Sequence, residues 1–214
     1  MKISTSMLGC DFLHLEQEIK KLENKKVDYI HIDLMDGHFV PNICLGFNII
    51  ADIKKITNIP FDVHLMLENP HEYIETIAHM LDGNSFITFH IESNSITKKA
   101  IDKIKALGIK AGLALNPKTP IERIKPFVND VDLVLQMTVQ PGYGGQQIIE
   151  SAIEKCHKIK KMLPSNVFLE ADGGINSNNM HILKQSGVDI IVMGSFFWTS
   201  HTQTIAEGLQ DDTN

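Results

Sequence analysis

Cysteine is scarce in this sequence, and neither an excess of positive charge nor a long apolar run is present. The 214 residues include three cysteines, Cys10, Cys44 and Cys156, which lie far apart and lack CxxC spacing. An odd number of scattered cysteines indicates reduced thiols rather than a disulfide scaffold. The formal net charge is -6, and the lysines form only short pairs. The basic surface that nucleic-acid binding requires is therefore missing.

No stretch of the sequence approaches the run of about 18 apolar residues that marks a membrane-spanning helix. The first residues reach Asp11 before any apolar segment develops, so we predict no signal segment. We therefore expect a cytoplasmic protein with no membrane partner and no nucleic-acid partner. With 43% hydrophobic and 21% charged residues, the composition is typical of one globular domain over residues 1–214.

Short β-rich runs alternate with longer segments of helical periodicity along the chain. The predicted strands are 2–8, 27–34, 61–67, 86–92, 109–115, 131–139, 166–171 and 189–194. The predicted helical segments are 11–23, 46–56, 70–81, 95–107, 120–127, 147–163 and 176–186, followed by a tail helix. This rhythm predicts an α/β fold, a closed parallel (β/α)8 TIM barrel. A doubly wound open sheet shares the rhythm, but it more often has fewer strands at this length.

Polar side chains stand at the ends of three predicted strands, where a (β/α)8 barrel carries its active site. His31 and Asp33 alternate along the second strand and therefore face the same side. His64 lies on the third strand, and Asp172 ends the seventh. Two imidazoles and two carboxylates suit a divalent ion such as Zn, Fe(II), Mn or Co. Unrelated buried residues, each satisfied by hydrogen bonds, are the alternative, but a shared cation offsets the cost of burying unpaired charges.

Other side chains on the predicted strands are expected to support this site. His90 falls on the fourth strand, and we predict a core or supporting role for it rather than ligation. Met35, Met66 and Met137 lie at or just beyond polar positions. They either fill the core or form a pliable apolar wall over a reactive intermediate.

Glycines follow the last three predicted strands. They are Gly142, Gly144 and Gly145 in TVQPGYGGQQ, Gly173 and Gly174 after the seventh strand, and Gly194 beside Ser195 after the eighth. Such turns can present backbone N–H groups to a phosphate, although no GK[ST] follows, so this is not a P-loop. One glycine-rich turn is more often merely a turn. Three of them at this end of a barrel predict a phosphate monoester as substrate.

With these motifs in place, the sequence resembles the D-ribulose-5-phosphate 3-epimerase family. The matching segments are SMLGCDF, HIDLMDGHFVPN, DVHLM, LNPKTP, VQPGYGGQ, EADGGI and the GS that ends the eighth strand. They occur in the family's order and cover essentially the whole chain. HIDLMDGHFVPN together with PGYGGQ is a highly specific pair.

The resemblance implies a metal-dependent 3-epimerase that interconverts D-ribulose 5-phosphate and D-xylulose 5-phosphate. The metal ligands would be His31, Asp33, His64 and Asp172, and the two aspartates would exchange protons with opposite faces of the sugar. The ion would act as a Lewis acid that stabilises a 2,3-enediolate, with no organic cofactor. The implied substrate-binding residues are Ser6, His64, Gly142, Tyr143, Gly144, Gly145, Asp172, Gly173, Gly174, Gly194 and Ser195. Family members are usually oligomeric, so we expect a homo-oligomer.

Three alternative functions stay open. The D-allulose-6-phosphate 3-epimerases form a sister group that is similar through the N-terminal half, including MDGHFVPN. A catalytically silent sugar-phosphate-binding barrel would keep the fold without the reaction. A metal-dependent hydrolase would need a metal-bound water as its nucleophile, and two carboxylates with two histidines suit enediolate chemistry better.

Overall fold

Eight parallel strands close into a barrel in the computed structural model, which describes residues 1–94 and 96–199. The strands are β1 (Lys2–Ser6), β2 (Tyr29–Asp36), β4 (Phe61–Met66), β5 (Phe86–His90), β6 (Lys110–Leu115), β7 (Leu133–Met137), β8 (Phe168–Asp172) and β9 (Ile190–Met193). The short strand β3 (Ile43–Cys44) pairs antiparallel with the end of β2. Neighbouring strands follow the order β1-β9-β8-β7-β6-β5-β4-β2, and pairing of β1 with β2 closes the ring. The predicted (β/α)8 TIM barrel is confirmed.

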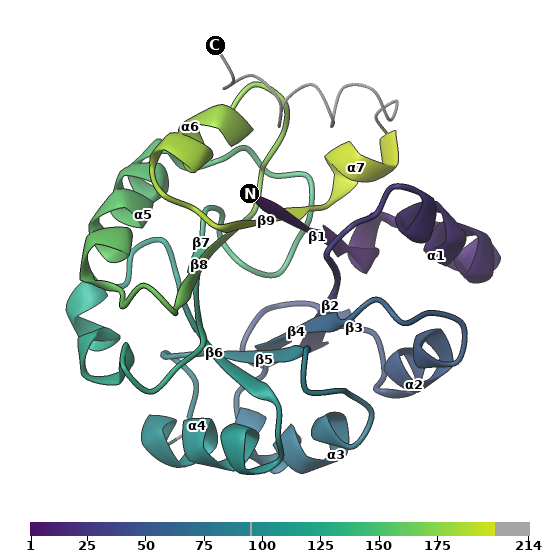
Figure 1. Ribbon diagram of the computed structural model, residues 1–214, viewed down its shortest axis with the longest axis horizontal. Coiled ribbons are helices and arrows are strands. Elements are labelled where there is room, and N and C mark those ends of the chain that lie inside the picture. The colour runs from purple at the N-terminus through teal and green to yellow at the C-terminus, as the bar shows by residue number, and fades with distance from the viewer. Residues whose placement is uncertain (95, 200–214) are drawn as a thin grey trace.

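Helices surround this barrel (Figure 1). They are α1 (Leu15–Asn24), α2 (Asn48–Lys54), α3 (Ile74–Ala78), α4 (Thr97–Ala106), α5 (Glu150–Met162), α6 (Met180–Gln185) and α7 (Ser195–Thr199). Short 3-10 turns are η1 (Met7–Gly9), η2 (Phe12–His14), η3 (Pro70–Glu72), η4 (Ile121–Arg123) and η5 (Lys125–Phe127). Within these residues no helix is long and apolar enough to cross a membrane.

Two expectations about the helices need comment. Segment 120–127 was expected to be helical, but it forms the two 3-10 turns η4 and η5. Pro126 lacks an N–H, and its ring clashes with a continuous α-helical backbone, so the segment does not form an α-helix. The tail helix is described only as α7, because residues 200–214 lie outside the described part. The extent of a single domain over 1–214 stays a prediction.

Alternation along β2 separates the apolar layer from the barrel interior. Ile30, Ile32 and Leu34 are fully or almost fully buried in the main hydrophobic cluster, which also includes residues of the surrounding helices. Burying each such side chain contributes about 1.5–3 kcal/mol. Because successive side chains point to opposite faces, this packing directs His31 and Asp33 into the barrel. The register of the hydrophobic layer therefore sets the position of the polar residues.

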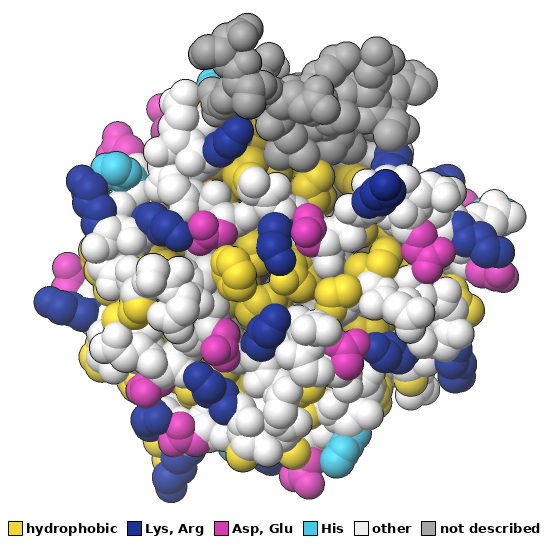
Figure 2. All heavy atoms as spheres, viewed as in Figure 1, with side chains coloured by type: hydrophobic (Ala, Val, Ile, Leu, Met, Phe, Trp, Pro, Cys, Tyr) yellow, Lys and Arg dark blue, Asp and Glu magenta, His cyan; other side chains and the backbone are white. Residues whose placement is uncertain are grey.

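The end of the barrel where the strands begin is closed by aromatic rings and lysine stems. Lys2 Nζ lies 5.1 Å from the Tyr29 ring centroid and 5.5 Å from that of Phe168. Lys110 Nζ lies 5.1 Å from the centroid of the Phe86 ring. Figure 2 shows hydrophobic side chains gathered at the centre of the visible face, with lysine or arginine side chains among them. The polar groups deeper in the barrel are therefore shielded from solvent on this side.

Candidate active site

Four side chains from three strands converge inside the barrel. The register of β2 and β4 places Asp33 beside His64, and Asp172 ends β8. One ligand atom from each of His31, Asp33, His64 and Asp172 lies within 4.8 Å of the other three. Within this metal quartet, Asp33 Oδ1 is 3.2 Å from His31 Nε2 and 3.0 Å from His64 Nδ1. The structure thus brings together all four residues that the sequence predicted as metal ligands.

Asp172 completes the quartet at a longer distance. Its Oδ2 lies 4.0 Å from His31 Nε2 and 3.9 Å from His64 Nδ1. The Asp172 side chain is 16% exposed, whereas the other three side chains are at most 5% exposed. Asp172 therefore forms the boundary between the buried quartet and the open pocket.

A buried carboxylate sets the proton position on His31. Asp62 Oδ2 lies 2.6 Å from His31 Nδ1 and also accepts a hydrogen bond of 2.8 Å from Ser4 Oγ. A carboxylate accepts hydrogen bonds, so Nδ1 of His31 carries the proton. The remaining nitrogen, Nε2, faces the oxygens of Asp33 and Asp172. Burial alone would lower the pKa of His31, but the charges of Asp33 and Asp62 raise it well above its usual range. A divalent ion held by these ligand atoms would replace the proton that Nε2 shares with Asp33.

The pKa values of the two aspartates in the quartet are shifted in opposite directions. Burial alone would raise the pKa of Asp33, but the charges and hydrogen bonds of His31 and His64 lower it below its usual range. Burial raises the pKa of Asp172 to about 7; the charges of Asp33 and Asp62 add to the increase, while His31 opposes it. Two carboxyl groups with pKa values pushed apart are typical of an acid/base pair.

A second acidic group lies deeper in the barrel. One ligand atom each from His31, Asp62 and Glu170 lies within 4.8 Å of the others. Burial and the charge of Asp62 raise the pKa of Glu170 well above its usual range, which favours its neutral form. His31 faces Asp62 through its protonated nitrogen, and this hydrogen bond leaves no free lone pair there for an ion. We interpret this group as support for the metal quartet.

A cavity of about 460 Å³ opens above the quartet. Of the predicted site residues it is lined by Ser6, Asp33, Met35, Met66, Met137, Gly142, Tyr143, Gly144, Gly145, Asp172, Gly173, Gly174, Gly194 and Ser195. His31 and His64 are fully buried and do not line it. The predicted substrate-binding role of His64 therefore has no support from the lining, whereas the predicted apolar wall of methionines does face the cavity.

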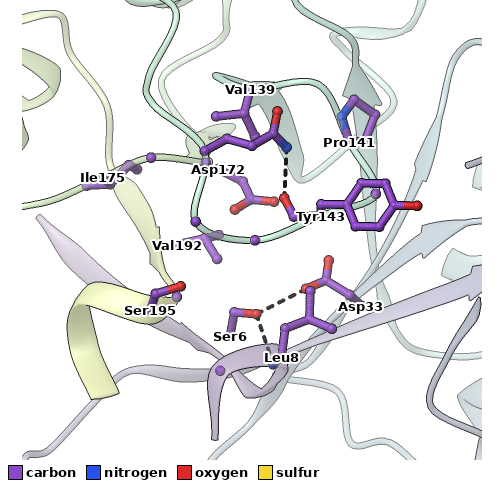
Figure 3. Close-up of a pocket in the computed structure, with 18 of the residues that line it drawn as sticks. Ser6, Leu8, Asp33, Val139, Pro141, Tyr143, Asp172, Ile175, Val192 and Ser195 are labelled. Atoms are coloured by element: carbon purple, nitrogen blue, oxygen red, sulfur yellow. Dashed lines mark hydrogen bonds between the residues drawn. The ribbon is translucent and has the colours of Figure 1, made fainter. Parts of the chain in front are cut away.

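Figure 3 shows dashed lines from Ser6 to Asp33 and to Leu8 on one side of the pocket, with Asp172 and Ser195 on other sides. Ser6 Oγ donates a hydrogen bond of 3.1 Å to Asp33 Oδ2 and accepts one of 3.3 Å from the Leu8 N–H. The hydroxyl therefore orients the oxygen of Asp33 that does not face the histidines.

The glycines of the cavity keep the backbone close to its interior. Gly174 has φ +67°, and an added Cβ would lie 2.5 Å from the Ile148 backbone nitrogen. Gly173 has φ +117°, and its Cβ would lie 2.3 Å from the Val139 side chain. Both positions thus require glycine for conformation and for space. Their turns leave a cavity wall of backbone groups, as a phosphate site needs.

Two contributors, Asn42 and Asp62, were missed from the sequence. Asn42 Nδ2 donates a hydrogen bond of 2.8 Å to the Gly142 carbonyl, and the predicted site residue Tyr143 donates one of 2.6 Å from its OH to the Pro41 carbonyl. These bonds tie the loop after β2 to the glycine-rich loop after β7. Asp62 was also missed, although it lies two residues before His64 and alternation places both on the inner face.

His90 has the supporting position that the sequence predicted. It lies outside the metal quartet, with its Nε2 atom 2.8 Å from His64 Nε2. Burial lowers the pKa of His90 to about 4, so the imidazole is neutral.

Comparisons with known proteins show the family and the fold. Residues 2–198 match the model of the Ribulose-phosphate 3 epimerase family. The ribulose-phosphate 3-epimerase of Helicobacter pylori strain J99 is 40% identical over 99% of this chain and 97% of that protein. The Bacillus subtilis strain 168 protein of the same name is 41% identical over 91% of each chain. Among solved structures, orotidine 5'-phosphate decarboxylase from Pyrococcus horikoshii shares the fold, with a TM-score of 0.66, 15% identity and 96% coverage of both chains.

Proposed function

The chain belongs to the ribulose-phosphate 3-epimerase family, and from this premise we propose that it interconverts D-ribulose 5-phosphate and D-xylulose 5-phosphate. Membership makes it an isomerase of the epimerase class. The proposal adds the substrate pair, dependence on one divalent ion, and a 2,3-enediolate intermediate with two aspartates as acid and base. A homo-oligomeric state and a cytoplasmic location stay predictions.

The observation that carries the proposal is the convergence of four potential ligand atoms in the metal quartet. His31 Nε2 and His64 Nδ1 both lie within 3.2 Å of Asp33 Oδ1, and Asp172 Oδ2 lies within 4.0 Å of both nitrogens. Zn, Fe(II), Mn and Co all accept such a set of imidazole and carboxylate ligands. A divalent ion bound there would supply Lewis acidity, which makes the proton beside a ketone easier to remove.

The side chains of the protein then move the C3 proton. Asp33 and Asp172 stand on β2 and β8, which are separated in the barrel by β1 and β9. They can therefore approach a bound sugar from different sides: one removes the C3 proton and the other returns a proton to the opposite face. Ser6 holds Asp33 in place, and the glycine-rich turns are proposed to bind the phosphate. Met35, Met66 and Met137 exclude water from the intermediate.

One experiment separates this proposal from its alternatives. Metal-loaded protein is incubated with D-ribulose 5-phosphate and, separately, with D-allulose 6-phosphate, and NMR follows formation of each C3 epimer. A higher kcat/KM for the pentose supports the proposal, and conversion of the hexose alone assigns the sister activity. Binding of both sugars without conversion would identify a silent barrel, and release of inorganic phosphate would identify a hydrolase. Asp33→Asn protein, purified identically, controls for contaminating epimerase.

A further inference from the structure

We propose that His90 and Glu92 are positioning residues that turn the metal-binding nitrogen of His64 toward the site. This inference rests on the proposed metal dependence of the function. It concerns two residues outside the metal quartet, one on β5 and one just beyond it. In this relay the carboxylate of Glu92 determines, through His90, which nitrogen of His64 carries a proton.

The relay is a continuous chain of close contacts. His64 Nε2 lies 2.8 Å from His90 Nε2, and His90 Nδ1 lies 3.1 Å from Glu92 Oε2. The His64 and His90 rings stack, with centroids 5.0 Å apart and planes at 29°. The ring of Phe39 lies 4.8 Å from that of His90, centroid to centroid. Because both histidines are fully buried, their hydrogen-bonding groups depend on each other rather than on water.

Glu92 is held as a hydrogen-bond acceptor at the outer end of the relay. Its Oε1 atom accepts a hydrogen bond of 2.9 Å from the Asn116 N–H and another from Thr119 Oγ1. Burial alone would raise the pKa of Glu92, but the contacts with His90, Thr119 and Asn116 lower it to about 2. The ionised carboxylate can only accept hydrogen bonds. The nitrogen that faces it, His90 Nδ1, must therefore donate.

The donor and acceptor roles continue from His90 to His64. His64 Nε2 and His90 Nε2 face each other, so one of them donates and the other accepts. His64 Nδ1 lies 3.0 Å from Asp33 Oδ1, a carboxylate oxygen that accepts hydrogen bonds. An ion in the quartet would replace the proton of this contact, and His64 Nε2 would then be the nitrogen that carries a proton and donates to His90. The relay thus orients the lone pair that a metal ion needs, as buried partners of metal-bound histidines commonly do.

The two histidines of the quartet are anchored to carboxylates in different ways. His31 contacts its carboxylate, Asp62, directly through Nδ1 and offers Nε2 to the site. His64 offers Nδ1 instead, and its Nε2 meets a carboxylate only through His90. Both rings therefore have one nitrogen toward the quartet and the other toward an acidic anchor. A residue that merely fills the core would not require this matched polarity.

Glu92→Gln tests the relay with little change of volume. The introduced amide has one acceptor oxygen and one NH2 group, so it cannot accept hydrogen bonds on both sides as the carboxylate does. If the amide oxygen keeps accepting hydrogen bonds from Asn116 and Thr119, the NH2 group donates to His90 Nδ1. His90 Nδ1 is then an acceptor, and His90 Nε2 becomes the donor to His64 Nε2. His64 Nδ1 then carries the proton. We expect Zn or Co(II) to bind about 10- to 100-fold more weakly, measured by competition with a chromophoric chelator.

Thr119→Val is the matched control. It removes a hydrogen bond to Glu92 Oε1 but leaves Oε2 free to accept from His90. We expect its metal affinity to stay within about threefold of the starting protein, since the Asn116 N–H still donates to Oε1 and Oε2 still accepts from His90. Circular dichroism and thermal unfolding establish that both variants are folded.

The outcomes separate this inference from the proposed function. Tight metal binding by the unaltered protein with a loss confined to Glu92→Gln supports the relay, and 15N chemical shifts of the Zn-loaded unaltered protein should place the His64 proton on Nε2. Equal affinity in Glu92→Gln and the unaltered protein would overturn it. An equal loss in Thr119→Val would show that Glu92 only anchors a loop. If the unaltered protein binds no divalent ion, the proposed metal dependence itself is wrong.

Discussion

Replacing one aspartate of the quartet should separate proton exchange from epimerisation. Asp172→Asn keeps the size of the side chain but removes a group whose pKa is raised to about 7 by burial and by the charges of Asp33 and Asp62, against the opposing effect of His31. Asp33 remains, still oriented by Ser6. Because only one acid/base group is left, a C3 proton can be removed and replaced only from the face that Asp33 reaches.

The expected magnitudes follow from this arrangement. Loss of a general acid or base lowers the rate by about 10²- to 10⁴-fold, which corresponds to about 2.7–5.4 kcal/mol in the activation barrier. Asp172→Asn should therefore epimerise at no more than about one hundredth of the original rate. It should still exchange the C3 proton of one epimer with solvent. Asp33→Asn should show the same loss and exchange the proton of the other epimer.

The assay is NMR in D2O with each pure epimer and enough divalent ion to saturate the variant. Saturation is needed because each substitution also alters a proposed metal ligand. Asp102→Asn on α4 is the control: this side chain is 58% exposed and pairs only with Lys98 among the ion pairs of the described residues, so its rate should be unchanged. Exchange at C3 of both epimers by either quartet variant would refute the assignment of one aspartate to each face.

Three further predictions concern the cavity wall, a thiol and the metal ion. Gly174→Ala should lose about 2 kcal/mol or more of unfolding free energy, because the residue has positive φ and a Cβ would meet the Ile148 nitrogen at 2.5 Å. Gly46→Ala is the control, because its Cβ would meet nothing within 4 Å in the described part of the chain. Urea unfolding measures the free energy of unfolding of both variants, and equal losses would contradict the prediction. Burial and the charge of Asp33 raise the pKa of Cys44 to about 11 from 9.0. Iodoacetamide at pH 8 should therefore alkylate Cys44 about 100-fold more slowly in folded metal-free protein than in unfolded protein. Mass spectrometry measures both rates, and equal rates would contradict the raised pKa. A chelator should abolish epimerisation, and a divalent ion at 100 times its Kd should then restore activity and add about 2.7 kcal/mol of stability; full activity in metal-free protein would refute the metal requirement.

The barrel and the metal quartet were predictable because both depend on simple periodicities. Alternation along β2 places His31 and Asp33 on one face, and the closed parallel topology brings the end of β8 to the same site. The 3-10 turns at 120–127 were missed because apolar spacing outweighed Pro126 in the sequence interpretation. Apolar residues at helical spacing therefore do not establish an α-helix by themselves when a proline lies within the segment.

Details that depend on contacts between distant segments were beyond the sequence. The 2.6 Å contact of His31 Nδ1 with Asp62 determines which nitrogen faces the site, and alternation says nothing about ring orientation. The link from Tyr143 to the Pro41 carbonyl joins residues 102 positions apart. Glu92 stands two residues after His90, so a contact between the two was predictable. The Asn116 N–H and the Thr119 hydroxyl, which donate hydrogen bonds to Glu92, come from the distant loop after β6.

The source of the C3 hydrogen tests the central claim most directly. Metal-loaded protein converts unlabelled D-ribulose 5-phosphate in D2O, and mass spectrometry and NMR locate deuterium in the first D-xylulose 5-phosphate formed. We expect one solvent deuterium at C3 of every product molecule, because one aspartate removes a proton and the other delivers a different one. Product that keeps its original C3 hydrogen would contradict an acid/base pair acting on opposite faces of the sugar.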